Sequence, residues 1–463
     1  MIYKPHPYQE FATKHIVENP ITVEDGAGLL LEMGLGKTVS TLTAIKQLLF
    51  DEFEVTKVLV VAPKRVAEFT WEEEMQKWDH LQCLSISKII GTEKQRKAAL
   101  KVKADVYAIN RENIPWLVSH LGGSFPFDML VIDELSSFKS NQAVRFKALR
   151  QIRPFLKRVV GLTGTPAPNG LIDLWPQIYL LDKGKRLGKT ITGFRETFFK
   201  AGKRNGNVVY EYKLKTDNSE KEIFDKIRDI CISMKAEDWL QLPERIDVTK
   251  EINLSDEVQK LYNEFEREQV LKLASEEEIT ALNAAALINK LLQFSNGAIY
   301  YGEGKQYYEV HNAKIEALEE LMEAANGNPV LVSYQFQSDV ERIKTHLKRF
   351  KPIHIADYRN VLADWNKGKI NILLGHTASM GHGLNMQSGG NLITHFGLGW
   401  GLEGYQQLVA RLHRQGQKQS VINTRLICPT TYEVNVLSRI EDKANVQETL
   451  MQAVKALVHK HTN

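Results

Sequence analysis

Residues 28–38 read GLLLEMGLGKT, and this stretch decides the fold. An apolar run is followed by a turn that contains two glycines and then by Lys37 and Thr38. A buried strand that passes through a glycine-rich turn into a helix directs backbone N–H groups and the positive end of the helix dipole at one point. Lys37 can then reach the β- and γ-phosphates of a nucleotide, and the Thr38 hydroxyl can bind Mg²⁺. The complete pattern has a glycine five positions before Gly36, where this chain has Leu31, so the sequence predicts a shortened phosphate loop.

An acidic pair follows another apolar run. Met129–Ile132 precedes Asp133 and Glu134, at the carboxyl end of a predicted parallel strand. Such folds place their ligands at this edge of the sheet. Asp133 is therefore the candidate Mg²⁺ ligand, and Glu134 is the candidate that orients or deprotonates an attacking water.

Similar apolar runs recur along both halves of the chain. Continuous apolar runs are typical of parallel strands that are buried on both faces. Two sets of such strands predict an α/β protein with two lobes. The predicted strands are 28–31, 58–62, 106–109, 129–132 and 159–162 in the first half, and 330–333, 370–374, 392–395 and 424–427 in the second.

A helical pattern separates the two sets of strands. The positions Val258, Leu261, Tyr262 and Phe265 share one helical face, Ser275 and Glu278 predict a capping box, and Asn296-Gly297 predicts a helix end. We therefore expect an N-terminal lobe over 1–240, a linker and helical protrusion over 241–310, and a C-terminal lobe over 311–463.

The first lobe is expected to contain a basic insertion at about 182–235. Its positive charges predict either a solvated surface or a track for phosphates, and the sequence leaves both open. These charges are Lys183, Lys185, Arg186, Lys189, Arg195, Lys200, Lys203 and Arg204.

The composition is that of an ordinary globular protein. The 463 residues are 43% hydrophobic and 25% charged, and the net charge of +4 permits a polyanionic partner without requiring one. Cys83, Cys231 and Cys428 lie far apart, so we expect three core thiols in a reducing compartment. No apolar run reaches the roughly 18 residues that span a bilayer, and the N-terminus has no signal-peptide core. These features predict a cytoplasmic protein without a membrane partner.

A motif near the C-terminus offers positive charge for a transferred phosphoryl group. Residues 407–417 read QLVARLHRQGQ. Arg411 and Arg414 are three residues apart, so a helix places them on one side. They are candidate arginine fingers, although an ordinary basic helix end is the alternative.

Together these motifs resemble the Swi/Snf-type branch of the superfamily-two helicases, and the resemblance covers nearly the whole chain. The motifs, in the family's order, are PYQ at 7–9, MGLGKT at 33–38, APK at 62–64, Asp133-Glu134, GLTGTP at 161–166, LPER at 242–245, LLQFSNG at 291–297 and RLHRQGQ at 411–417. The resemblance implies two RecA-like lobes with helical insertions, ATP and Mg²⁺ as cofactors, and DNA as the partner.

The resemblance also implies a role for individual residues. ATP would be held by Gln9, Gly34, Leu35, Gly36, Lys37, Thr38 and Gln407, and the metal by Thr38 and Asp133. Catalysis would involve Lys37, Asp133, Glu134, Arg411 and Arg414. Thr163 and Thr165 would couple the nucleotide state to DNA, and the implied DNA contacts are Pro63, Lys64, Asn110, Thr163, Thr165, Gln335, Gly383, Asn385 and Trp400.

The chain departs from the family pattern at several positions. Ser136 stands where many relatives have histidine, Ala378 replaces a common arginine, Met380 replaces a glycine, and Gly401-Leu402 replaces Asn-Pro. The resulting forms MGHGLNMQSGG and WGLEGYQQ look more like the small phage and prophage members of the family than like eukaryotic remodellers.

The resemblance favours an ATP-driven translocase that moves along double-stranded DNA as a monomer. A strand-separating helicase and a nucleotide-gated DNA-binding scaffold with little turnover are the alternatives. A replication, recombination or nuclease protein of a phage is a conceivable partner, but the sequence names none.

Overall fold

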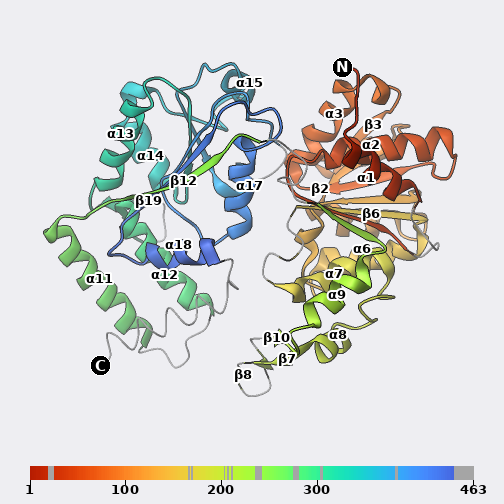
Figure 1. Cartoon of the computed structure of the whole chain (residues 1–463), viewed down its shortest axis with the longest axis horizontal. Coiled ribbons are helices and arrows are strands. Elements are labelled where there is room, and N and C mark those ends of the chain that lie inside the picture. Colours follow the sequence, from red (N-terminus) through yellow and green to blue (C-terminus); the bar gives the residue numbers. More distant parts are fainter. Residues whose placement is uncertain are drawn as a thin grey trace. The chain divides into compact units, whose positions relative to one another are not determined.

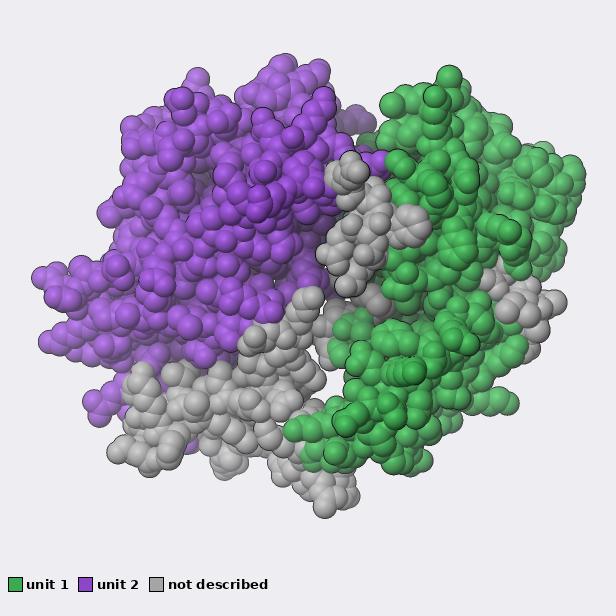
Figure 2. Space-filling model, viewed as in Figure 1, with its two compact units in different colours: residues 1–241 green, residues 242–463 purple. Residues whose placement is uncertain are grey.

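The computed structural model describes residues 1–18, 25–164, 167, 170–202, 204–205, 208–209, 212–234, 242–274, 281–302, 306–380 and 384–442. The chain divides into two compact units, 1–241 and 242–463 (Figure 2), and each unit contains a parallel sheet. Thr165, Gly383 and the expected capping box at Ser275 and Glu278 lie outside the described residues.

Seven parallel strands form the sheet of the first unit, in the spatial order β11-β1-β6-β5-β2-β4-β3. All five strands that the sequence predicts in this half are present. Because the strands run parallel, their carboxyl ends lie along one edge of the sheet. Their bounds are β1 Ala27–Leu31, β2 Val58–Ala62, β3 Ile86–Ile89, β4 Val106–Asn110, β5 Met129–Asp133, β6 Arg158–Thr163 and β11 Cys231–Met234.

Helices cover both faces of the first sheet (Figure 1). Leu59 and Val61 of β2 point into a core with α5, α6 and α7, while α1, α2 and α3 cover the other face. The helices are α1 Pro7–Glu18, α2 Lys37–Lys46, α3 Trp71–Lys77, α4 Glu93–Lys101, α5 Ile114–Leu121, α6 Val144–Ile152, α7 Leu174–Asp182, α8 Ile191–Phe198 and α9 Ser219–Ile227. Two short hairpins pair β7 Phe199–Ala201 with β10 Tyr212–Leu214, and β8 Arg204–Asn205 with β9 Val208–Val209.

The second unit contains a sheet of six parallel strands in the order β12-β19-β18-β15-β17-β16. All four strands predicted in this half are present. β12 lies within the range that the sequence assigns to the linker and protrusion, and it pairs with β19 along its whole length. The bounds are β12 Arg245–Glu251, β15 Val330–Tyr334, β16 Ile353–His354, β17 Ile372–His376, β18 Leu392–His395 and β19 Val421–Ile427.

Helices also cover both faces of the second sheet. The sheet has a hydrophobic core on each face, and alternate residues of β15 point into different cores. Val330 and Val332 pack with α13 and α14, whereas Leu331 packs with α15 and α17. The helices are α11 Asp256–Ala274, α12 Ala281–Asn296, α13 Ala313–Ala324, α14 Gln337–His346, α15 Val361–Asn366, α16 Thr377–Met380, α17 Leu402–Leu412 and α18 Glu433–Asp442, and a hairpin joins β13 Ala298–Tyr300 to β14 Tyr307–Glu309.

The helices α11 and α12 form the expected helical insert, and they pack against each other and against α18. Gly297 has a φ of 94° directly after α12, which confirms the predicted helix end. The predicted apolar face of α11 is partly wrong, because Leu261 is 50% exposed. The buried positions are instead Tyr262, Glu266, Val270 and Leu273, which follow a 3.6-residue period over the longer helix.

One of the basic side chains of the insertion, the largely buried Arg186, fits neither interpretation that the sequence left open. Arg186 forms ion pairs with Asp25 at 2.8 Å and with Asp229 at 2.6 Å, and Lys185 pairs with Asp25 at 3.1 Å. The Asp25 side chain is fully buried just before β1. These contacts tie the insertion to the start of the strand that carries the phosphate loop. Other basic residues of the stretch, such as Lys200, are exposed.

The cysteines only partly match the expectation. Cys231 and Cys428 are buried core thiols, and burial raises the pKa of the Cys428 thiol to about 12. Cys83 is exposed, so the prediction of three core thiols is wrong for this residue, which follows a short turn rather than a strand. Among the helices that the structure describes, none has both the length and the apolar character needed to cross a bilayer.

Candidate nucleotide site and surrounding motifs

The phosphate loop (residues 33–38) connects β1 to the first turn of α2. Gly34 and Gly36 have φ values of 91° and 70°, in the left-handed region that favours glycine. Lys37 Nζ donates hydrogen bonds to the carbonyl oxygens of Leu31 at 2.6 Å and Glu32 at 3.3 Å. The ammonium group is therefore held against the carboxyl end of β1.

Gln9 of α1 lies against the phosphate loop. A Cβ atom built on Gly36 would overlap Gln9 Nε2, so only glycine allows this close approach. Gln9 Oε1 accepts hydrogen bonds from the backbone N–H of His6 at 3.0 Å and from the Tyr3 hydroxyl at 3.5 Å. The buried amide is thus oriented by its own segment. The structure thus brings Gln9 next to the loop whose residues the resemblance also assigns to ATP.

Leu35 and Thr38 complete the loop. Leu35 is fully buried and anchors the turn to the core, whereas Thr38 is half-buried in the first turn of α2. Across the loop lies Gly164, which follows β6. A Cβ on Gly164 would lie 3.6 Å from Lys37 Nζ. The GLTGTP motif therefore reaches the phosphate loop, which the sequence alone did not reveal.

Asp133 ends β5, and β6 is the single strand between β5 and β1. Trp71, the first residue of α3, donates its indole N–H to Asp133 Oδ2 at 3.0 Å. Burial raises the pKa of Asp133 to about 6, and the nearby Glu134 carboxylate adds to the rise. The Trp71 hydrogen bond and the positive charge of Lys37 oppose it. A half-buried carboxylate in this position is suited to bind a divalent cation.

Glu134 has a left-handed backbone conformation, with φ 65° and ψ 61°. This conformation costs a non-glycine residue roughly 1–3 kcal/mol, and such residues cluster at functional sites. The carboxylate is held by two hydroxyl groups: Ser136 Oγ donates to Glu134 Oε1 at 2.8 Å, and Thr163 Oγ1 donates at 3.2 Å. Ser136 therefore supplies a hydrogen bond despite its departure from the family pattern, and Thr163 links β6 to the acidic pair.

Three DNA-contact candidates of the first unit, Pro63, Lys64 and Asn110, lie at the carboxyl ends of β2 and β4. Lys64 is exposed, whereas Pro63 is buried at the start of the following helix. Asn110 is also buried: it donates to Glu112 Oε2 at 2.9 Å and accepts from Asn113 Nδ2 at 2.6 Å. In this structure Asn110 stabilises its own turn, so Lys64 is the more accessible of the three candidates.

In the second unit, Gln407, Arg411 and Arg414 belong to α17 and the turn that follows it. Arg411 Nη1 and Arg414 Nη1 both donate to the carbonyl oxygen of Leu384, at 3.3 Å and 3.4 Å. The two guanidinium groups thus share an acceptor, but Arg414 lies beyond the end of α17, so the prediction that one helix carries both is wrong. Gln407 is buried, and its Nε2 donates to Glu403 Oε1 at 3.1 Å.

The remaining candidates of the second unit differ in their surroundings. Gln335 follows β15 and donates to Thr377 Oγ1 at 3.4 Å, and Asn385 is exposed. Trp400 is half-buried between α12 and α18, where the Arg439 guanidinium lies 5.1 Å from its ring centroid. The Trp400 ring thus contributes mainly to the core of this unit.

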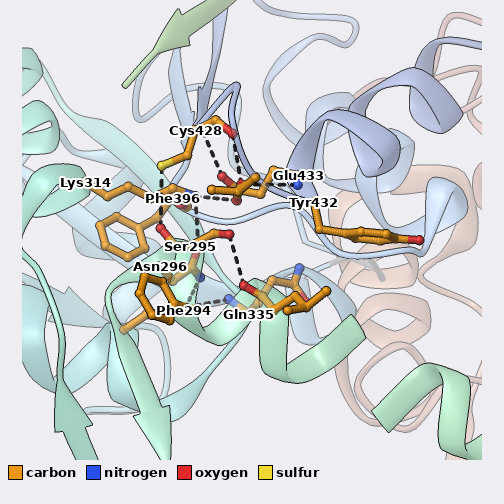
Figure 3. A network of polar contacts seen from close by, with 12 residues as sticks. Phe294, Ser295, Asn296, Lys314, Gln335, Phe396, Cys428, Tyr432 and Glu433 are labelled. Carbon is orange, nitrogen blue, oxygen red and sulfur yellow. Dashed lines mark hydrogen bonds and ion pairs between the residues drawn. The ribbon is translucent and has the colours of Figure 1, made fainter. Parts of the chain in front are cut away.

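A buried polar network holds the backbone of Gln335 in place (Figure 3). The sequence did not reveal this network. Asp339 Oδ2 accepts the backbone N–H of Gln335 at 3.1 Å and the side-chain amide of Asn296 at 3.0 Å. Lys314 Nζ donates to Asn296 Oδ1 at 2.9 Å and pairs with Glu433 at 2.5 Å. The network therefore connects the end of the helical protrusion, α13, α14 and α18.

The fold and the site are those of a P-loop ATPase with two RecA-like lobes. Comparison with known proteins identifies the family. The model of the SNF2-related domain matches residues 8–296, and that of the helicase conserved C-terminal domain matches residues 313–416. The chain belongs to the SNF2-related family, which confirms the resemblance noted in the sequence, and members of this family use ATP.

Three relatives show how the chain compares with whole proteins. Putative protein p41 of Acyrthosiphon pisum secondary endosymbiont phage 1 is 37% identical, over 98% of this chain and 99% of that protein. An uncharacterized ATP-dependent helicase of Mycoplasma genitalium is 26% identical, over 94% of this chain and 41% of that protein. The putative ATP-dependent helicase/translocase YwqA of Bacillus subtilis is 24% identical, over 96% and 49%. The chain spans less than half the length of the two bacterial relatives.

Among solved structures, the Sulfolobus solfataricus SWI2/SNF2 ATPase core in complex with dsDNA matches with a TM-score of 0.45. It is 21% identical, and the match covers 99% of this chain and 96% of that one.

Proposed function

We propose that this protein hydrolyses ATP and uses the energy to move along double-stranded DNA. The observation that carries the proposal is the edge of the first sheet, where Lys37 lies in a phosphate loop and the Glu134 carboxylate is fixed by the hydroxyls of Ser136 and Thr163. Membership of the SNF2-related family supports both ATP as the fuel and DNA as the track.

The residues of the first unit fit a nucleotide with Mg²⁺. Gly34 and Gly36 adopt left-handed backbone conformations that let the phosphate loop turn tightly, and Lys37 supplies positive charge for the phosphates. Thr38 and the half-buried Asp133 would hold the metal, which neutralises phosphate charge. Glu134 would orient the attacking water and accept its proton. Arg411 and Arg414 are the candidates that stabilise charge on the transferred phosphoryl group.

Thr163 is the candidate that couples hydrolysis to DNA, because its hydroxyl already reaches the Glu134 carboxylate. Lys64, Gln335 and Asn385 are the candidate contacts to the DNA backbone. Contacts to phosphates position a protein without reading the base sequence, so binding should be largely sequence-independent and should weaken with salt. A motor of this kind that is related to a phage protein would act in the cytoplasm of a bacterial host.

The first experiment measures ATP hydrolysis by the wild-type protein with duplex DNA, single-stranded DNA or RNA. We expect the strongest stimulation with duplex DNA and a loss of turnover in Lys37→Ala. Equal or stronger stimulation by RNA would contradict the duplex-DNA proposal. DNA binding without measurable hydrolysis would favour a nucleotide-gated scaffold.

The second experiment separates translocation from strand separation. The protein is incubated with ATP and either a forked duplex or a triplex whose third strand can be displaced only by movement along the duplex. A duplex translocase displaces the third strand and leaves the fork paired. Efficient unwinding of the fork would instead identify a strand-separating helicase.

A further inference from the structure

Trp71 connects the candidate metal carboxylate to the segment that follows β2. Its side chain is fully buried, and its indole N–H donates to Asp133 Oδ2 at 3.0 Å. The two residues are 62 positions apart in the sequence. A buried indole N–H needs a hydrogen-bond partner, but a core tryptophan seldom finds this partner on a candidate metal ligand.

The helix that carries Trp71 begins at the exposed Lys64. Helical residues run without interruption from Lys64 to Lys77, and the turn Val66–Thr70 is π-helical. Such wide turns are rare inside α-helices and are frequent at functional sites. Here the residue that follows is Trp71. One rigid element therefore has a candidate phosphate contact at its first residue and a hydrogen bond to Asp133 seven residues later.

We propose that Trp71 is a positioning residue that fixes the orientation of the Asp133 carboxylate and transmits DNA contact at the start of this helix to it. This role rests on the proposed function of the site. The indole N–H engages Oδ2, so Oδ1 would be the oxygen that remains to hold the metal. Partners that orient a metal ligand in this way typically change metal affinity by about 10- to 100-fold when they are removed.

A movement at Lys64 would be carried along the helix as a rigid body. The carboxylate would respond because it is bonded to the indole. DNA should therefore tighten metal binding through Trp71. If Trp71 served only to fill the core, its replacement would leave the effect of DNA on metal binding unchanged.

The test compares Trp71→Phe with Trp175→Phe in the whole protein. Phenylalanine stays aromatic but lacks the N–H donor and also part of the ring volume, so the control must share this loss of volume. Trp175 is a matched control, because it is also buried in the first unit and donates its indole N–H, at 2.9 Å, to the carbonyl of Gly188, which is outside the candidate site.

The readout is the Mg²⁺ concentration that gives half-maximal binding of a fluorescent ADP analogue, measured with and without duplex DNA. No turnover is required. In Trp71→Phe we expect this concentration to rise about tenfold or more and to become insensitive to DNA. In Trp175→Phe both properties should match the wild type, even where its melting temperature falls by a similar amount.

An unchanged Mg²⁺ requirement and an unchanged DNA effect in Trp71→Phe would overturn the role of Trp71. If the wild-type protein binds no nucleotide, the proposed function itself fails, and this outcome can be told apart from a failure of the Trp71 proposal alone. If Trp71→Phe does not fold, Trp71→His decides the question, because its imidazole keeps an N–H donor. Its Mg²⁺ requirement should then respond to DNA as the wild type does, and the loss of that response in a folded Trp71→His would overturn the proposal.

Discussion

Replacing Lys314 with methionine tests how much the buried network contributes to the stability of the second unit. Lys314 and Glu433 have fully buried side chains and form an ion pair at 2.5 Å. The same ammonium donates to Asn296 Oδ1 at 2.9 Å and to the carbonyl of Phe396 at 3.0 Å (Figure 3). Methionine fills nearly the same space, but it leaves three buried acceptors without this donor.

The expected loss follows from burial. Removing one partner of a buried ion pair typically destabilises a protein by about 3–5 kcal/mol, because a buried charge is left uncompensated. An exposed pair contributes only about 0–1 kcal/mol. Lys344 and Asp357 provide the exposed comparison: their pair is also short, at 2.8 Å, but both side chains are 37% exposed. Lys344→Met should therefore cost at most about 1 kcal/mol.

Hydrogen exchange followed by mass spectrometry is the suitable assay, because a chain with two units need not unfold in one step. In Lys314→Met, slow amides of β18 and β19 should exchange roughly a hundred- to several-thousand-fold faster than in the wild type. The double variant Lys314→Met/Glu433→Gln should be less destabilised, since it removes the unpaired charge. If Lys314→Met lost less than about 1 kcal/mol of stability, as expected for Lys344→Met, this result would refute the inference that burial makes the Lys314–Glu433 pair costly to break.

Three further outcomes follow from the described geometry. Gly36→Ala should weaken nucleotide binding at least about tenfold in a fluorescence titration, because its Cβ would overlap Gln9 in addition to the cost of about 1 kcal/mol for a left-handed alanine. Gly368 has a similar φ of 68°, but a Cβ at this position would stand in open space, so the control Gly368→Ala should keep the wild-type affinity for the nucleotide. Glu134→Gln should bind ATP normally but hydrolyse it roughly 100-fold or more slowly in single-turnover assays, and normal hydrolysis would exclude Glu134 as the base. Burial raises the pKa of Asp339 from its ordinary 3.8 to about 6, so the native state binds more protons than the unfolded chain between these values, and its contribution to stability falls as the pH rises through that window. Urea unfolding of Asp339→Asn should lack this decline, and a parallel pH profile in the variant and the wild type would contradict the assignment.

The central strands could be predicted from the sequence because parallel strands buried on both faces are almost uninterrupted apolar runs. The strands that escaped prediction lie at or near the edges of the sheets and lack such runs. β3 alternates buried residues with half-buried Ile86 and Lys88, and β12 reads RIDVTKE and is largely exposed. An edge strand of this kind is recognisable only through its partner. The partner of β12 is β19, and the paired residues Asp247 and Asn423 are 176 positions apart in the sequence.

The candidate site likewise has parts that the sequence predicts and parts that it does not. The phosphate loop and the acidic pair are continuous in sequence, so their residue types and spacing indicate their chemistry. The contacts that orient them depend on the assembled sheet: Trp71 with Asp133, Thr163 with Glu134, and Gln9 against Gly36. No local pattern predicts that a given indole or hydroxyl will reach a given carboxylate.

The pairing of β12 with β19 also determines where the second unit could be cut away from the first. A fragment that began at 311, the lobe boundary expected from the sequence, would lack β12 and leave one side of β19 with unpaired backbone groups. Unpaired strand edges recruit other chains, so such a fragment should associate or aggregate. A fragment that begins at Leu242 retains the seven residues of β12 and the contact of the Pro243 carbonyl with the His413 ring at 2.8 Å. For recombinant work on this unit alone, Leu242 is the better first residue.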